Sequence, residues 1–205
     1  ASKSQVLPTS QIRRERRRLS DGPCRVRMLE GPELGDEHWD AMDRFYRSTA
    51  ARKWGHPYLS ESFFECIRRE FAEAVRFAEA RCGDRLVAGA LFFQRGQNLY
   101  GRYWGCDETH RHLHFETCFY SAIEYCIDQG LDRYEAGAQG EHKLARGFEP
   151  QPIHSAHWIA DPRLSAAVQD FCRAEATHTT RIIEALDQRS VFRDDGPAVP
   201  APGSQ

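Results

Sequence analysis

Apolar positions along the chain recur with two periods, which predict helices in some segments and strands in others. Residues 37–51 carry their large apolar side chains at helical spacing, as does a following segment that Ser60 caps. Residues 114–129 show the strongest helical period, and Gly130 stands at the C-terminal cap position. Each of these helices is therefore expected to bury one apolar face.

Elsewhere the pattern changes to an alternation of apolar and polar residues, which is typical of strands. It predicts an antiparallel meander over residues 74–81, 85–95 and 98–105, joined by tight hairpins. Further elements are expected as strands over 24–29, 133–138 and 152–159, a helix over 9–20, helical turns over 141–146 and a long helix over 162–188. This order predicts an α/β fold, in which a mixed sheet with an antiparallel meander carries helices on both faces.

Composition sets the class of protein and its boundaries. The chain is 40% hydrophobic and 28% charged, as is usual for a soluble globular protein. Residues 1–8 and the Pro-, Gly- and Ala-rich residues 191–205 are expected to be disordered, which leaves one domain over 9–190. We find no apolar run near the roughly 18 residues of a membrane span and no signal-peptide pattern, and expect a cytoplasmic protein.

Charge and cysteines narrow the function classes. The net charge of −2 gives no reason to expect nucleic acid as a partner of the whole chain. However, QIRRERRR at residues 11–18 is dense in arginine, and is either a solvated helix face or a footprint for phosphate or a polyanion. The seven cysteines are odd in number and form no CxxC pair, so we expect most of them to be reduced, partly buried thiols rather than a disulfide framework or zinc ribbon.

A loop of small residues, EAGAQGEHKLARGF at 135–148, places an acid, an imidazole and an amine side by side. It follows a strand end, where ligands gather in α/β sheets. Glu141 is either a base or a charge that complements a helix dipole, and His142 is either a base or a surface imidazole. Lys143 either holds a phosphate or carboxylate or is simply solvated. The three together favour an acid–base site.

The segment HRHLHFE carries three histidines at every second position, followed by Glu116. In a strand, His110, His112 and His114 would share one face and suit a metal, but the segment runs into a helix, so no metal site is predicted. His114 stands at that helix N-terminus, where a dipole favours an anion. Glu116 is either a capping carboxylate or a buried functional acid.

Two further motifs offer binding residues. In YGRYWGC, alternation places Tyr100, Arg102 and Trp104 on one strand face, where Arg102 pairs with a carboxylate or phosphate or serves as an interface arginine. In RKWGHPY, Lys53 and Trp54 lie in a loop and either line an acceptor groove or cover the core.

These passages resemble a known family. QIRRERRR, HWDAMDRFYRSTAARKWGHPYLSESFFECI, DRLVAGALFFQRGQNLYGRYWGC and LHFETCFYSAIEYCIDQGLDRYEAGAQGEHKLARGF are together similar to the GNAT acyltransferase superfamily, and more closely to its Fem-type branch. RKWGHPYL, YGRYWGC, HFE and EAGAQGEHKLARGF resemble bacterial predicted N-acyltransferases linked to peptidoglycan biosynthesis or recognition. The resemblance covers residues 9–190 and looks like the C-terminal half of those proteins.

The resemblance implies transfer of an acyl or aminoacyl group to an amine of a small-molecule or cell-wall precursor acceptor. The residues proposed for this chemistry are Glu141, His142 and Glu116 as catalytic groups and Lys143, His114, Arg102, Trp104, Lys53 and Trp54 as binding groups. GCDETHRHLHFE lacks the glycine-rich pyrophosphate loop of acetyl-CoA users, so acyl-CoA and aminoacyl-tRNA both stay open as donors, with no other cofactor expected. The alternative is a non-catalytic module that binds a peptidoglycan-like ligand.

Overall fold

The computed structural model describes residues 9–52, 56–137 and 141–187. They divide into two compact units, one formed by Pro8–Gly137 and one by the chain from Ala138 onward with the first seven residues. The two ends that are expected to be disordered, residues 1–8 and 191–205, lie outside the described residues. The single domain over 9–190 stays a prediction. Each unit is described by itself below.

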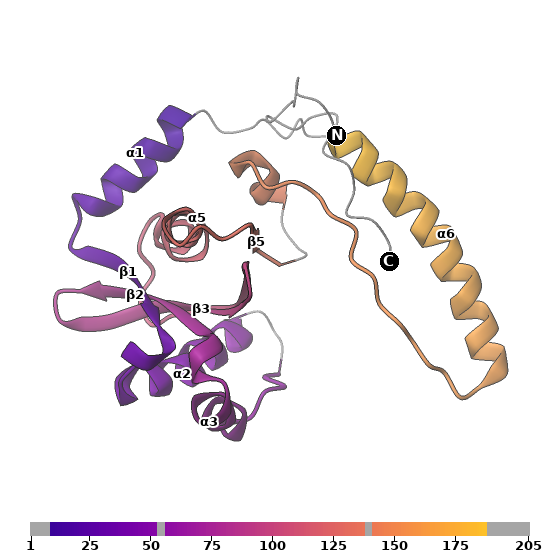
Figure 1. The fold of residues 1–205 in the computed structure, drawn as a ribbon, viewed down its shortest axis with the longest axis horizontal. Helices are drawn as coiled ribbons and strands as arrows, with labels where there is room; N and C mark the ends of the chain where they lie inside the picture. The colour runs from indigo at the N-terminus through magenta and orange to yellow at the C-terminus, as the bar shows by residue number, and fades with distance from the viewer. Residues whose placement is uncertain (1–8, 53–55, 138–140, 188–205) are drawn as a thin grey trace. The chain divides into compact units, whose positions relative to one another are not determined.

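The first unit is a five-stranded sheet with helices on both faces (Figure 1). Its strands are β1 (Cys24–Glu30), β2 (Val75–Cys82), β3 (Arg85–Arg95), β4 (Asn98–Cys106) and β5 (Arg133–Glu135). Its α-helices are α1 (Thr9–Ser20), α2 (Asp36–Arg52), α3 (Glu61–Glu70), α4 (Leu113–Phe115) and α5 (Ser121–Asp128). Short 3-10 turns cover Gly31–Glu33 and Ala72–Ala74, and a π-helical turn, η3, covers Glu116–Tyr120.

The strands lie in the order β1-β2-β3-β4-β5. The first four are antiparallel to their neighbours, so the predicted meander is confirmed, while β5 runs parallel to β4. β5 is short and pairs only with Asn98–Tyr100. Within the described part of the chain, β4 from Gly101 onward therefore has a strand partner on one side only.

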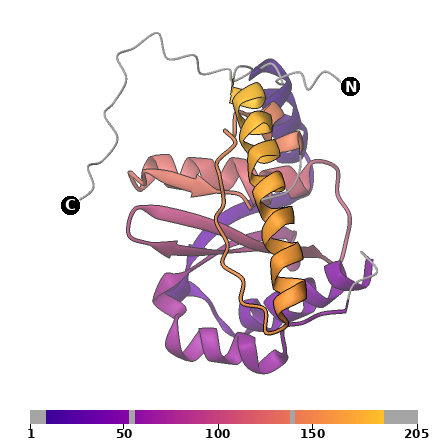
Figure 2. The same ribbon diagram turned by 90° about the vertical axis from the view of Figure 1, so that its right-hand side faces the viewer.

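Large apolar side chains fill the sheet face covered by α2 and α3, which both views place on the side opposite α5 (Figures 1 and 2). Phe45 and Phe77 are almost fully buried there. Two strand glycines make this packing possible, because a Cβ at Gly89 would lie 2.2 Å from the Phe77 ring and one at Gly105 would lie 2.0 Å from the Phe45 carbonyl oxygen. α2 therefore crosses directly over the end of β4.

The opposite sheet face, under α5, combines small residues with a few large ones, among them Phe92 and Leu99. The buried alanines on it are Ala78, Ala80, Ala88 and Ala90. Because these side chains are short, the helical layer lies close to the strands. Arg76 extends from β2 and donates to the Tyr125 hydroxyl of α5 at 2.6 Å, which ties the layers together.

A β-bulge in β4 makes the expected single face of Tyr100, Arg102 and Trp104 wrong. Gly101 lies opposite Phe92 and Tyr103 lies opposite Leu91, so Arg102 is an extra residue without a partner in β3. The bulge shifts the alternation by one position. Trp104 consequently packs in the α5-side cluster, whereas Tyr103 packs against the α2 side.

The helix expected over 114–129 is present but interrupted. It begins as the single turn α4, widens into η3 and continues as α5. The Ser121 hydroxyl donates back to the carbonyl of Glu116, five residues earlier, at 2.8 Å. A π-helical turn inserts one residue into a helix, which apolar spacing alone does not reveal.

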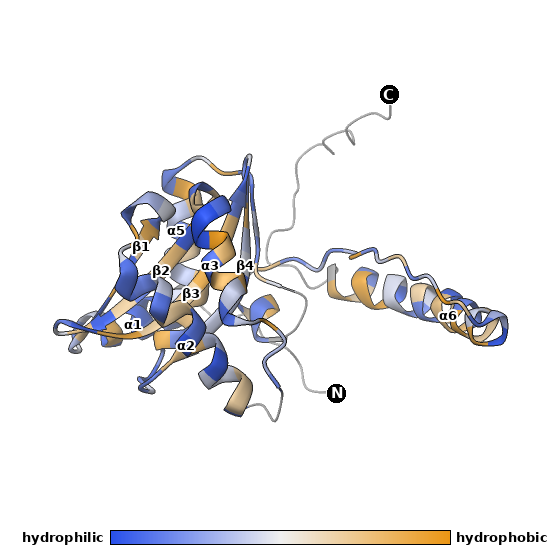
Figure 3. Ribbon diagram, turned by 90° about the horizontal axis from the view of Figure 1, so that it is seen from below, coloured by the Kyte–Doolittle hydropathy of each residue, from blue (hydrophilic) through white to orange (hydrophobic). Residues whose placement is uncertain are grey.

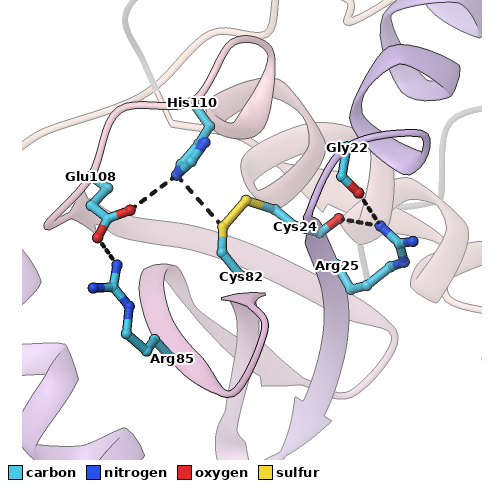
Figure 4. Close-up of a disulfide and its surroundings, with 7 residues drawn as sticks. All are labelled: Gly22, Cys24, Arg25, Cys82, Arg85, Glu108 and His110. Atoms are coloured by element: carbon cyan, nitrogen blue, oxygen red, sulfur yellow. Dashed lines mark hydrogen bonds and ion pairs between the residues drawn. A yellow bond between two sulfur atoms is a disulfide. The ribbon is translucent and has the colours of Figure 1, made fainter.

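Most of the described cysteines are free, as expected, but one pair is not. Cys24 and Cys82 are directly opposite each other in β1 and β2, with Cα atoms 4.1 Å apart, and form a disulfide (Figure 4). Their sequence separation of 58 hides this pairing in the sequence, because only strand register brings them together. Among the described residues, the free cysteines are Cys66, Cys106, Cys118, Cys126 and Cys172.

The second unit contains a 3-10 segment, η4 (Glu141–Arg146), and α6 (Pro162–Asp187), as predicted. The strand expected over 152–159 is not formed, and these residues have no regular structure. A strand needs a neighbour for its backbone groups, and the described residues of this unit provide none. Along α6, hydrophobic and hydrophilic residues alternate in bands (Figure 3). Of the helices that the structure describes, none has the length and hydropathy to cross a membrane.

Candidate functional site

A cleft of about 380 Å³ opens at the carboxyl end of β4 in the first unit. Its walls come from the end of α2, the end of β4, the following loop and the start of α4. The residues that line it are Thr49, Arg52, Trp104, Cys106, Glu108, Thr109, His110, Leu113 and His114. We call it the β4 cleft. Ligands of α/β sheets bind beyond the carboxyl ends of strands, which makes this the expected location for a substrate.

The end of α2 holds the end of β4 in place. The Ser48 hydroxyl donates to the carbonyl of Cys106 at 3.0 Å, and the Thr49 hydroxyl donates to the carbonyl of Trp104 at 2.6 Å. These hydroxyls satisfy strand carbonyls that β5, paired only with residues 98–100, does not reach. One turn later, the Arg52 guanidinium approaches Cys106 Sγ to 3.2 Å. α2 thus brings a cation into the β4 cleft.

Two predicted binding residues meet in one wall of the cleft. The rings of Trp104 and His114 lie edge to face, with centroids 5.2 Å apart. His114 also packs edge-on against Phe119, at 5.6 Å. These contacts fix an imidazole and an indole beside Arg52, an arrangement that suits a polar ligand with a flat or apolar portion.

Among the other predicted binding residues that the structure describes in this unit, Arg102 is not part of the cleft lining. Arg102 is exposed, and its guanidinium lies 5.9 Å from the centroid of the Tyr100 ring. Lys53 and Trp54 lie outside the described residues. The binding roles of these three side chains stay predictions.

The turn into α4 has an unusual backbone. His112 adopts φ +67°, a left-handed conformation that is uncommon for a residue other than glycine. Its carbonyl accepts from the amides of Phe115 and Glu116 at 3.0 and 3.1 Å, and the Leu113 amide donates to the carbonyl of His110 at 3.3 Å. The turn therefore uses most of the first-turn amides that would otherwise be available to a phosphate.

Glu116 is buried, as a functional acid would be, but its carboxylate faces an arginine. Arg16 of α1 donates from Nε to both carboxylate oxygens at 3.1 Å and from Nη2 to Oε1 at 2.8 Å. The same guanidinium also donates to Glu124 at 2.7 Å. These contacts, to Glu124 first and then Glu116, raise the pKa of Arg16 despite its partial burial. The contact seen for Glu116 is thus an ion pair that fastens α1, and its catalytic role stays a prediction.

A second cleft, of about 460 Å³, lies between α1 and β1, and we call it the arginine cleft. Its lining residues are Arg13, Arg16, Arg17, Leu19, Ser20, Cys24, Arg25, Val26 and Glu116. The arginine run of α1 is therefore divided in its roles. Arg16 is held by carboxylates, whereas Arg13 and Arg17 are exposed at the cleft. This arrangement concentrates positive charge around one hollow.

The predicted acid–base loop belongs to the second unit. His142 and Lys143 lie in η4, where Arg146 Nη1 donates to the carbonyl of His142 at 3.0 Å. Burial, then the charges of Arg146 and Lys143, lower the pKa of His142. The neutral imidazole therefore predominates at neutral pH, as a general base requires. The side chain of Glu141 lies outside what the structure describes.

Sequence reasoning missed several residues of the β4 cleft. Thr49, Arg52 and Glu108 are not among the predicted site residues, and His110 stands in the segment HRHLHFE, for which no metal site is predicted. The one available signal was the position of Arg52 at the start of RKWGHPY, a motif that was singled out for its next two residues. Only the crossing of α2 over Gly105 brings it to the strand end.

The fold is that of the GNAT acyltransferases. An aminoglycoside acetyltransferase from an uncultured soil metagenomic sample, solved with sisomicin, matches 68% of this chain and 98% of its own, with 10% identity and a TM-score of 0.50. A possible acetyltransferase from Clostridium difficile 630 matches 66% of this chain and 98% of its own (12% identity, TM-score 0.49). L-PGS from Bacillus licheniformis matches 78% of this chain and 45% of its own (12% identity, TM-score 0.46).

The family follows from the sequence match. A family model named FemAB-like, described as peptidoglycan biosynthesis/recognition, matches residues 8–194, and the chain belongs to this family. A search of curated proteins finds no match. The family match and the fold are those that the resemblance implied.

Proposed function

We propose that the protein is an N-acyltransferase that joins an acyl or aminoacyl group to a primary amine of a small polar acceptor, such as a cell-wall precursor. The observation that carries the proposal is the β4 cleft, which unites Arg52, Trp104 and His114 at the strand end of an acyltransferase fold. In this proposal Arg52 holds an anionic group of the acceptor. The Trp104–His114 wall orients the remainder.

The reaction needs three events. A base removes a proton from the acceptor ammonium, the free amine attacks the donor carbonyl, and the tetrahedral oxyanion collapses. A C–N bond forms while a C–S or C–O bond breaks, and the leaving thiol or alcohol takes up a proton. Glu141, His142 and Lys143 of the second unit stay a separate proposal for the acid–base group: the lowered pKa of His142 keeps its imidazole neutral, with Glu141 as its acidic partner and Lys143 as a contact to substrate. Glu116 is proposed to act only indirectly, through Arg16.

The donor class is an additional part of the proposal. The amides of Leu113, Phe115 and Glu116 already have acceptors, which weakens the turn as a pyrophosphate site. The arginine cleft offers an alternative contact for a phosphate backbone, through Arg13 and Arg17. These two features favour an aminoacyl ester carried by tRNA over acyl-CoA.

The test supplies the full chain with acyl-CoA or aminoacyl-tRNA donors and a panel of amines that includes muropeptide precursors. Amide products are detected by mass spectrometry. We expect product with at least one donor, and expect His114→Ala and Arg52→Ala each to lower kcat/KM by about 10- to 100-fold. Arg95→Ala is the matched control, because Arg95 is exposed at the end of β3 and outside the cleft lining. No product with any donor, or equal losses in the control, would contradict the proposal.

The same experiment separates the alternative of a binding module. Calorimetry with muropeptides then measures affinity without turnover. Binding that survives His142→Ala, weakens with Arg52→Ala and yields no amide with any donor would assign the β4 cleft to recognition only.

A further inference from the structure

A group of metal-binding side chains lies beside the β4 cleft and has no part in the proposed transfer. The sulfurs of Cys24 and Cys82 and a ring nitrogen of His110 all lie within 4.8 Å of one another. They come from three separate segments, β1, β2 and the loop after β4 (Figure 4). Thiolates and imidazole are the ligands that Zn²⁺ prefers.

We propose that, once the Cys24–Cys82 disulfide is reduced, Cys24, Cys82 and His110 bind one Zn²⁺ ion, with Glu108 as the fourth ligand. This inference goes beyond the transfer reaction and does not rest on it. It gives the disulfide edge of the sheet a second state, in which a metal ion links the same strands.

The distances fit a tetrahedral ion. His110 Nε2 lies 3.5 Å from Cys82 Sγ and 3.3 Å from Glu108 Oε2. A zinc tetrahedron with Zn–S of about 2.3 Å and Zn–N and Zn–O of about 2.0–2.1 Å has an S···N edge of about 3.5 Å and an N···O edge of about 3.3 Å. The imidazole of His110 and the carboxylate of Glu108 are therefore already placed at the spacing of a site, with Cys82 Sγ beside them.

Only the two sulfurs must move. In the tetrahedron they stand about 3.8 Å apart, which requires their covalent bond to be broken. Cys24 is buried, whereas Cys82 is half-buried, so Cys82 has room for a change of side-chain rotamer without displacing its strand. A phosphine reductant supplies the two electrons and becomes its oxide, with water supplying the oxygen and the two thiol protons. Zinc binding then releases those protons.

The charges also balance. Two thiolates and the Glu108 carboxylate carry three negative charges, and Zn²⁺ with the neighbouring Arg85 supplies three positive ones. Arg85 forms an ion pair with Glu108 on the side away from His110 (Figure 4). Such a second contact fixes the orientation of a ligating carboxylate. His110 also lines the β4 cleft, which gives the ion a route of entry.

The test is a titration of the full chain with Co²⁺, which reports thiolate ligation by its charge-transfer absorption and tetrahedral geometry by its d–d bands. We expect the phosphine-reduced chain to bind one Co²⁺, which Zn²⁺ displaces, and the oxidised chain to bind none at this site. Cys24→Ser, Cys82→Ser and His110→Ala should each weaken binding by at least tenfold. Cys66→Ser, which removes an exposed free thiol, should leave binding unchanged.

A second measurement needs no substitution and holds even where a cysteine variant fails to fold. Zn²⁺ should slow alkylation of Cys82 in the reduced chain by at least tenfold and leave alkylation of Cys66 unchanged, as read by peptide mass spectrometry. The proposal is overturned if the reduced chain shows no thiolate–cobalt band, if His110→Ala binds like Cys66→Ser, or if Zn²⁺ protects neither Cys82 nor Cys24.

Discussion

The two faces of the sheet differ in the side chains that cover them. One face supports the fold, whereas clefts open at the margins of the other. The face under α2 and α3 is filled by aromatic rings, with Phe45 and Phe77 at its centre. The face under α5 combines buried alanines with Phe92 and Leu99, and both described clefts take strand residues from it, Trp104 in one and Val26 in the other. Both clefts thus open at the margins of the α5 side.

Each face also contains a buried carboxylate that is bound by arginine. Glu79, on the α2 side, accepts from Arg27 at 2.8 Å, from Arg81 at 2.9 Å and from His38 at 3.1 Å. Because His38 Nδ1 accepts from the Gly35 amide, its Nε2 carries the proton that reaches Glu79. Glu116, on the α5 side, is bound by Arg16 alone among arginines of the described residues. Glu79 thus joins three side chains, and we call it the hub. Glu116 joins η3 to α1 through Arg16, and we call this ion pair the clasp.

The largest effect is expected at the hub. Glu79→Ala should lower the free energy of unfolding by about 3 kcal/mol, since it leaves Arg81 and His38 without their shared acceptor. Urea unfolding measures this difference. Glu65→Ala, an exposed position on α3, is the control and should change stability by less than about 0.5 kcal/mol.

The pH dependence of the free energy of unfolding, compared between wild type and Glu79→Ala, is a second test of the hub. Burial raises the pKa of Glu79, but its bonds to His38, Arg27 and Arg81 outweigh burial, and the net pKa lies below 4.5. Its contribution is therefore complete at neutral pH and is lost as pH falls through that lowered pKa. The gap between wild type and Glu79→Ala should narrow in acid, and a constant gap would argue against an ionic hub.

Gly105→Ala should come next, at about 2 kcal/mol, because the new Cβ meets the Phe45 backbone at 2.0 Å. This change also tests whether the faces are independent, since α2 carries Arg52 into the β4 cleft. We expect unfolding measurements to show the loss and substrate affinity to fall with it. Gly35→Ala, with only one neighbour at 3.9 Å, should do neither.

Arg16→Ala should cost less, about 1.5 kcal/mol, because the arginine is one-third exposed and Glu116 can recruit water. Arg14→Ala removes an exposed charge from the same helix and should have little effect. Thermal unfolding of both variants distinguishes a clasp from a general effect of charge. Equal Tm values for the two would contradict the assigned role of Arg16.

The last prediction concerns which residue acts as the catalytic base. If His142 is the base, the acid limb of the kcat/KM profile should have its midpoint below 6.5, since its pKa is lowered from that value. His142→Ala should remove this limb. A limb that persists in the variant would place the base elsewhere, for instance at His114 in the β4 cleft.

Local patterns predicted most of the elements but few of the contacts between them. The alternation of residues 74–105 was sufficient for the three-stranded meander, because each hairpin is local. The pairing of Cys24 with Cys82 depends on register across distant segments, which no local signal encodes. The strand expected over 152–159 had the right alternation and lacked a partner.

Some residues of the candidate site could be predicted from the sequence, and others could not. Trp104 and His114 were selected from their motifs and do lie together. Arg52 entered the cleft only through helix crossing, which depends on a glycine far along the chain. Glu116 is buried, but its arginine partner stands 100 residues away, which its motif does not reveal.

The bulge at Arg102 has a consequence for chain length. Because Gly101 and Tyr103 already pair with consecutive residues of β3, a chain shortened by Arg102 alone should form an unbroken ladder with every ring still on its own side. Deleting Tyr103 in its place should put Arg102 opposite Leu91, so that an arginine replaces the Tyr103 ring on the α2 side. Relatives that lack one residue at this position would share this architecture. An alignment of such a relative that places no gap in YGRYWGC would mismatch Trp104.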